Sequence, residues 1–158
     1  MKTKLLLAIA VMAISPLFLN SQELCIQNAW DAYNKGKYKE AINFAEQCIE
    51  DFDIKASNIQ SELDSLKITP QTGSVNAIQK ERIFKNSHLN DVATACFIKG
   101  RSAEYIYKQD QKNNIAYKQT AIEAYTLSCK YSKGRCWDPQ GFFWSPCESS
   151  SERLQKLK

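Results

Sequence analysis

Six cysteines are the residues of this sequence with the clearest chemical potential. They stand at positions 25, 48, 96, 129, 136 and 147. Metal binding is disfavoured because no CxxC pair occurs and His88 is the only histidine, so the usual zinc-ligand spacing is absent. An even number of cysteines in an exported chain indicates disulfide bonds. We therefore expect disulfides, and neither a metal nor a cofactor.

Groups suited to catalysis are sparse. A nucleophile needs an adjacent base, and His88 lies in "KNSHLND", beside the expected start of a helix, where a surface or capping role is favoured. The five glycines are scattered, so no phosphate-binding loop is indicated. Asp51 and Asp53 fall on the polar side of a predicted helix, whereas a glycosidase needs two carboxyl groups across a cleft. The sequence predicts a protein that is not an enzyme, with a small hydrolase as the weakest alternative.

Rigid aromatic side chains are concentrated near the end of the chain, in "RCWDPQGFFWSPC" at 135–147. Asp138, Pro139 and Gly141 predict a turn, because proline presets one turn position and glycine permits positive φ at another. The flanking aromatic residues are candidate binding residues: Trp137, Phe142, Phe143 and Trp144. They could cap the apolar end of the last helices, which is the favoured interpretation, or form an exposed platform for a sugar ring or a peptide.

The first 21 residues have the order of a secretory signal peptide. Lys2 and Lys4 precede an apolar run at 5–19, which at about 15 residues is shorter than the roughly 20 needed to span a bilayer. We expect cleavage near Ser21 and a periplasmic or secreted protein that meets the membrane only transiently during export. Loss of both lysines lowers the net charge from +4 to about +2, and no basic run longer than two residues occurs. Nucleic acid is therefore an unsuitable partner.

The segment at 23–52 shows the spacing of two antiparallel helices joined at a glycine. Small and aromatic residues recur at fixed positions on either side of that turn: Ala29, Gly36, Tyr38, Ala41, Ala45 and Cys48. This pattern resembles a tetratricopeptide repeat, in which small residues lie where the helices cross and an aromatic follows the turn. The expected proline after the second helix is missing. The resemblance implies an all-α fold of antiparallel helical hairpins and a groove that binds a protein or peptide.

The remaining elements follow from periodicity and from helix-breaking residues. No Gly or Pro interrupts 37–69, so one long helix is expected at about 37–67, packed within the molecule rather than in a coiled coil. Asn76 and Gln79 resemble a capping box before a short helix at 77–85. Gly100 predicts a close helix crossing in a second hairpin. We expect a single domain at 22–158, made of a first hairpin (22–67), a loop and short helix (68–88), a second hairpin (89–131), and an aromatic tail with a terminal helix (132–158).

The helix assignments also suggest which cysteines pair. Cys25 and Cys48 lie at similar distances from the turn at Gly36, and Cys96 and Cys129 lie at similar distances from the turn near Lys112. Cys136 would then pair with Cys147 and close the aromatic loop. The predicted disulfides are Cys25–Cys48, Cys96–Cys129 and Cys136–Cys147.

These observations favour a non-catalytic, exported interaction module. Its helical groove is expected to bind an envelope or extracellular protein or peptide through Tyr33, Tyr105 and Tyr107. The alternative is a carbohydrate or cell-wall binder that uses the aromatic tail.

Overall fold

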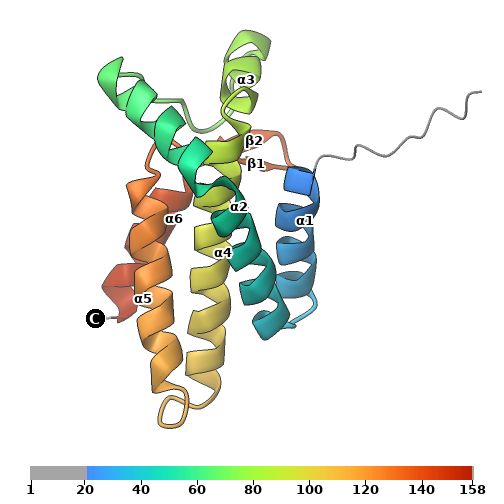
Figure 1. Cartoon of the computed structure of the whole chain (residues 1–158), viewed down its shortest axis with the longest axis vertical. Coiled ribbons are helices and arrows are strands. Elements are labelled where there is room, and N and C mark those ends of the chain that lie inside the picture. The colour runs from blue at the N-terminus through green and yellow to red at the C-terminus, as the bar shows by residue number, and fades with distance from the viewer. Residues whose placement is uncertain (1–20, 158) are drawn as a thin grey trace, which may run out of the picture.

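Six helices and one short β-hairpin make up residues 21–157, the part of the chain that the computed structural model describes (Figure 1). The expected signal peptide at 1–21 lies outside this part, apart from Ser21. The all-α prediction is confirmed, since the strands within residues 21–157 are confined to one two-stranded sheet. The helices are α1 (Ser21–Asn34), α2 (Tyr38–Ser65), α3 (Ala77–Phe84), α4 (Ser87–Gln109), α5 (Ile115–Lys130) and α6 (Pro146–Leu157), and the strands are β1 (Cys136–Asp138) and β2 (Phe142–Trp144).

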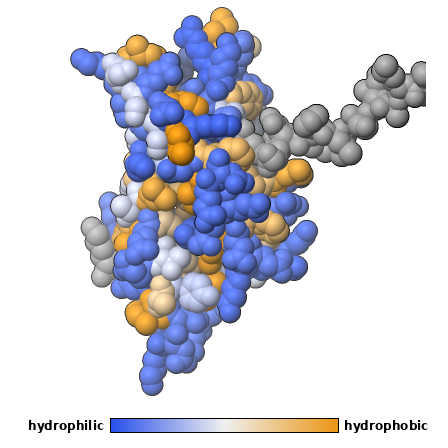
Figure 2. All heavy atoms as spheres, viewed as in Figure 1, coloured by the Kyte–Doolittle hydropathy of each residue, from blue (hydrophilic) through white to orange (hydrophobic). Residues whose placement is uncertain are grey.

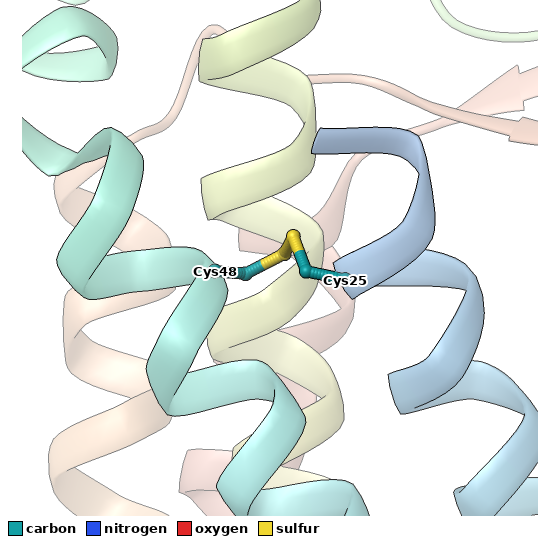
Figure 3. The surroundings of a disulfide bond; sticks show 2 residues. All are labelled: Cys25 and Cys48. Atoms are coloured by element: carbon teal, nitrogen blue, oxygen red, sulfur yellow. A yellow bond between two sulfur atoms is a disulfide. The ribbon is translucent and has the colours of Figure 1, made fainter. Parts of the chain in front are cut away.

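The first hairpin, α1 and α2, forms as its small residues predict. Gly36 adopts a positive φ of 71° in the turn, a conformation that suits glycine because it lacks a Cβ. Ala29, Ala41 and Ala45 are completely buried, which lets the two helices approach closely. Cys25 and Cys48 are joined by the predicted disulfide, which ties α1 to α2 (Figure 3).

The second hairpin places α4 at the centre of the molecule, in contact with α1, α2, α5 and α6. Gly100 faces the ring of Tyr125 on α5, and a Cβ at residue 100 would lie 2.5 Å from that ring. The predicted close crossing is therefore confirmed. The long helix is confirmed as well, because α2 spans 28 residues and packs along α4.

The loop before α3 is fastened to the C-terminal β-hairpin. Gly73 and Phe143 exchange two backbone hydrogen bonds, of 2.7 and 3.0 Å. Arg135 is 4% exposed and donates hydrogen bonds to the carbonyl oxygen of Pro70 through both Nε and Nη2. The expected capping box of α3 is present, with Asn76 and Gln79 bonded to each other's backbone N–H groups. Segments far apart in the sequence thus form one end of the molecule.

The aromatic tail contains structure that the sequence analysis did not predict. The expected turn is present, with the Gly141 N–H donating to the Asp138 carbonyl oxygen at 2.9 Å. The residues on either side of it form paired strands, in which Cys136 lies opposite Trp144 and Trp137 lies opposite Phe143. Strand pairing, rather than a disulfide, closes this loop.

Two of the three predicted disulfides are wrong, because four cysteines are unpaired: Cys96, Cys129, Cys136 and Cys147. Cys96 lies in the core cluster that α4 shares with α1 and α2, whereas Cys129 faces α6. Cys96 and Cys129 are similarly far from the turn along the chain, but this does not bring them together. Their side chains project from different sides of α4 and α5. In the tail, the strand register places Trp144 opposite Cys136 and leaves Cys147 on α6.

The face of the molecule seen in Figure 2 is largely hydrophilic, and its apolar side chains gather in separate patches. Within residues 21–157, no helix combines the length and the apolar character needed to cross a membrane.

Candidate functional site

A continuous row of aromatic rings runs from the β-hairpin across α4 and α1 to the far end of the first hairpin. We call it the aromatic band, and its members are Trp144, Phe97, Trp30, Tyr33, Tyr38 and Tyr105. Successive ring centroids are 5.1, 6.5, 5.8 and 5.8 Å apart from Trp144 to Tyr38, and Tyr38 stacks on Tyr105 at 4.9 Å. Every member keeps some solvent exposure. The band therefore lies at the surface, and Trp30, Tyr33, Tyr38 and Phe97 also pack against the hydrophobic core.

Arg101 holds the tyrosine end of the band. Its Nε and Nη2 donate to the Tyr33 hydroxyl at 3.2 and 3.1 Å, and its Nη2 also donates to the Tyr105 hydroxyl at 3.3 Å. The guanidinium also lies 5.1 Å from the centroid of the Tyr105 ring, a cation–π distance. Burial alone would lower the pKa of Arg101, but the hydrogen bond to Tyr33 and the electrostatic effects of Tyr33, Tyr125 and Glu104 together outweigh it, and the pKa rises. A permanent positive charge therefore stands among the tyrosines.

The electrostatic surroundings of Arg101 are cationic. Its nearest carboxylate among the described residues is Glu104, at 3.8 Å, and that carboxylate also pairs with Lys108 and Arg153. The Tyr125 hydroxyl donates to Glu104 as well, at 2.6 Å. Three cations thus share one buried carboxylate, so this end of the band carries excess positive charge. Such a site favours an anionic group.

A cavity of about 310 Å³ adjoins the other part of the band, between α1, the start of α4 and the β-hairpin. Trp30 belongs to both features. The cavity is at the small end of the range for ligand pockets and suits a single side chain or ring. Aromatic groups form one part of its wall and polar groups of α4 the other: Trp30, Phe84, Trp137 and Phe143, then Ser87, Asn90, Asp91 and Thr94.

The structure separates the predicted helical site residues into two groups. Tyr33 and Tyr105 come together in the band, with ring centroids 5.9 Å apart. Tyr107 does not join them: its ring is not part of the row of ring contacts, and it packs against the cluster around Ile42 and Tyr125.

The predicted tail residues are divided between the two faces of the β-hairpin. Phe143 is 1% exposed and acts as a cap. Trp137 shares its face of the hairpin and lines the cavity, whereas Trp144 faces the other way and contacts Phe97. Phe142, opposite Asp138, is half-buried and lies outside both the band and the cavity lining.

Four site residues were missed in the sequence: Trp30, Tyr38, Phe97 and Arg101. Helical spacing contained part of the signal, since Trp30 lies three residues before Tyr33 and Arg101 lies four before Tyr105. In the sequence, Tyr38 indicates only the aromatic position that follows the turn of the first hairpin. The juxtaposition of Phe97 with Trp30 and Trp144 depends on how three elements pack.

No group of three or more His, Cys, Asp or Glu side chains within the described part of the chain is arranged to hold a metal ion. Comparison of the chain with protein-family models, curated proteins and solved structures found no match in any of the three.

Proposed function

We propose that this chain is a non-catalytic, exported interaction module that binds an extended peptide segment of another protein along the aromatic band. The observation that carries the proposal is the unbroken row of partly exposed rings that ends at the guanidinium of Arg101. We further propose that an acidic side chain or a C-terminal carboxylate of the peptide pairs with Arg101. In this proposal, the two helical hairpins are degenerate tetratricopeptide repeats.

The composition of the band suits protein recognition. Trp, Tyr and Arg dominate binding energy at protein interfaces because they supply large contact areas at a low cost in conformational entropy. Nε and Nη2 of Arg101 already donate to the tyrosine hydroxyls, so a carboxylate would pair with the guanidinium charge and accept from Nη1. An apolar side chain beside the acidic group could enter the cavity next to Trp30.

A peptide fits these surroundings better than a carbohydrate does. A sugar platform needs an open aromatic face, but Lys80 covers the ring of Trp137 at 3.9 Å from its centroid, and Phe143 is buried. Trp144 packs against Phe97. The charge of Arg101 also has no counterpart in a neutral oligosaccharide.

Export of the protein is supported by the disulfide between Cys25 and Cys48, because such bonds persist in oxidising compartments. The apolar run at 5–19 supplies the corresponding signal. N-terminal sequencing of the protein recovered from its own cells tests this part of the proposal. A new terminus near residue 22 is expected, and an intact Met1 terminus would contradict it.

Peptide selection tests the binding proposal directly. A displayed library of random peptides would be selected on residues 22–158, and the enriched peptides measured by fluorescence anisotropy. We expect acidic peptides with apolar or aromatic neighbours, and at least a tenfold loss of affinity in Tyr105→Ala and in Arg101→Gln. Tyr105 is 39% exposed, so its truncation should leave the fold intact.

Ile54→Ala provides the matched control, because Ile54 is 77% exposed and lies outside the band. It should bind as the parent does. Peptides that bind Tyr105→Ala and Arg101→Gln with parental affinity would contradict the proposed site, and failure to enrich any peptide would contradict the proposed class of ligand. A change in Trp fluorescence on adding oligosaccharides would favour carbohydrate binding instead.

A further inference from the structure

Two of the unpaired cysteines meet between the last turn of α5 and the first turn of α6. The Cys129 thiol donates to the backbone carbonyl oxygen of Cys147 at 3.1 Å and lies 3.3 Å from the Ser151 hydroxyl. The Cys129 thiol is also near enough to that of Cys147 to influence its ionisation. Both residues are half-buried, so small solutes can reach them. The sequence predicts other partners, Cys96 for Cys129 and Cys136 for Cys147.

The other two unpaired cysteines have quite different surroundings. Cys96 is completely buried, and burial raises the pKa of its thiol to about 12. Cys136 is held between Thr94 and Trp144, and burial raises its pKa to about 12 as well. Because burial disfavours the reactive thiolate at both positions, both are expected to stay reduced.

We propose that Cys129 and Cys147 form a second disulfide bond, which cross-links α5 to α6. The bond encloses the whole segment that carries the β-hairpin. It also fastens the helix that brings Arg153 to within 3.5 Å of Glu104. The cross-link therefore stabilises the position of α6 against the centre of the molecule.

The reaction is a thiol–disulfide exchange with a low-molecular-weight disulfide such as glutathione disulfide. One cysteine thiolate attacks a sulfur of that disulfide, forms a mixed disulfide and releases one glutathione thiolate. The second cysteine thiolate attacks the protein sulfur of the mixed disulfide and releases the other. The two protein thiols lose two protons and two electrons in total, and glutathione disulfide gains them as two molecules of glutathione.

The thiol surroundings predict how the rate depends on pH. Burial, together with the contact with Cys129, raises the pKa of Cys147 to about 12. Because the thiolate is the attacking species, exchange should be slow at neutral pH and faster at pH 9.

Peptide mapping tests the assignment. The full chain would be incubated with glutathione disulfide at pH 8.5, alkylated and digested with trypsin without reduction. Trypsin places Cys129 in the peptide 119–130, and Cys136 and Cys147 together in the peptide 136–153. We expect these two peptides to be joined. The bond between Cys25 and Cys48 serves as an internal positive control for the digest.

Two variants identify the partner of Cys129. The joined mass should persist in Cys136→Ser and disappear in Cys147→Ser, with circular dichroism confirming that both variants are folded. A bond within the peptide 136–153 would overturn the proposal, because it would pair Cys136 with Cys147. Full alkylation of Cys129 and Cys147 in a sample where the control bond is intact would overturn it too.

Discussion

Glu104 takes part in three of the seven ion pairs found among the described residues, more than any other side chain. Its side chain is 2% exposed and contacts Arg101, Lys108, Arg153 and the Tyr125 hydroxyl. Burial alone would raise the pKa of Glu104, but the hydrogen bonds from Lys108 and Tyr125 and the charges of Lys108 and Arg153 together outweigh it, so the pKa lies below its ordinary value of 4.5. The folded state therefore binds a proton here less readily than the unfolded chain does.

This difference predicts acid sensitivity. A carboxyl group with a lowered pKa in the folded state contributes stability above its unfolded pKa, and that contribution is lost as the pH falls through its folded pKa. At pH 7 we expect Glu104→Gln to lower the free energy of unfolding by about 2 kcal/mol, because it leaves the largely buried Arg101 and the buried Tyr125 hydroxyl without a carboxylate. Urea unfolding between pH 7 and pH 3 provides the measurement.

The loss caused by Glu104→Gln should shrink as the pH falls below the ordinary pKa of Glu104. Glu81→Gln is the control, because Glu81 pairs with Lys85 at the surface, where both side chains are at least 70% exposed. Its effect should stay within about 0.5 kcal/mol. Equal effects of the two substitutions would contradict a special role for Glu104.

The crossing of α4 and α5 shows how one position can determine the spacing of two elements. Gly100 is helical and carries no side chain, so the ring of Tyr125 lies directly on the α4 backbone. The same contact buries Tyr125 and directs its hydroxyl to Glu104. The helix thus tolerates a residue of poor helix propensity because tertiary packing requires it.

Gly100→Ala tests this account through the sign of its effect. Helix propensity alone predicts that alanine stabilises α4 by about 1 kcal/mol. The new Cβ would lie 2.5 Å from Cδ1 of Tyr125, so overpacking should instead destabilise the protein by about 1–3 kcal/mol. Thermal unfolding followed by circular dichroism distinguishes the two, and a higher Tm in the variant would refute the close crossing.

Helix α3 and the β-hairpin differ in how far local sequence signals predict them. The capping box at Asn76 was recognised from two residues and is present, because both of its hydrogen bonds are local. The strands β1 and β2 were not predicted, although the turn between them was. Their pairing is extended by Gly73, which is 70 residues before Phe143 in the chain and cannot be inferred from the turn.

At the scale of the whole molecule, two helical hairpins are fewer than the three repeats that usually give a stable solenoid. The molecule supplements them with α6, with the β-hairpin that buries Phe143, and with the disulfide of the first hairpin. Two core clusters result, one around α1, α2 and α4 and the other around α4, α5 and α6. Helix α4 belongs to both and connects them.

Removing the disulfide of the first hairpin should lower the stability of the entire domain. Cys25 and Cys48 are 23 residues apart, and a closed loop of that size contributes about 3 kcal/mol by restricting the unfolded chain. We expect Cys25→Ser, Cys48→Ser to lose about this amount in urea unfolding. The parent and the variant should both also carry Cys129→Ser, so that a disulfide of Cys129 cannot contribute to the difference. A reductant should affect only the protein that retains Cys25 and Cys48, and equal sensitivity would contradict the prediction.

The sequence by itself determined the helical class, the first hairpin and its disulfide, the long α2 and the α3 cap. These features depend on residues close in the chain, where the spacing of alanines, a turn glycine or a capping pair acts directly. The tertiary structure decided the surroundings of the remaining cysteines, the strand pairing and the composition of the aromatic band. Each of these depends on the rotational phase at which α1, α4, α5 and the tail pack against one another, and that phase results from the combined burial of many side chains rather than from any local pattern.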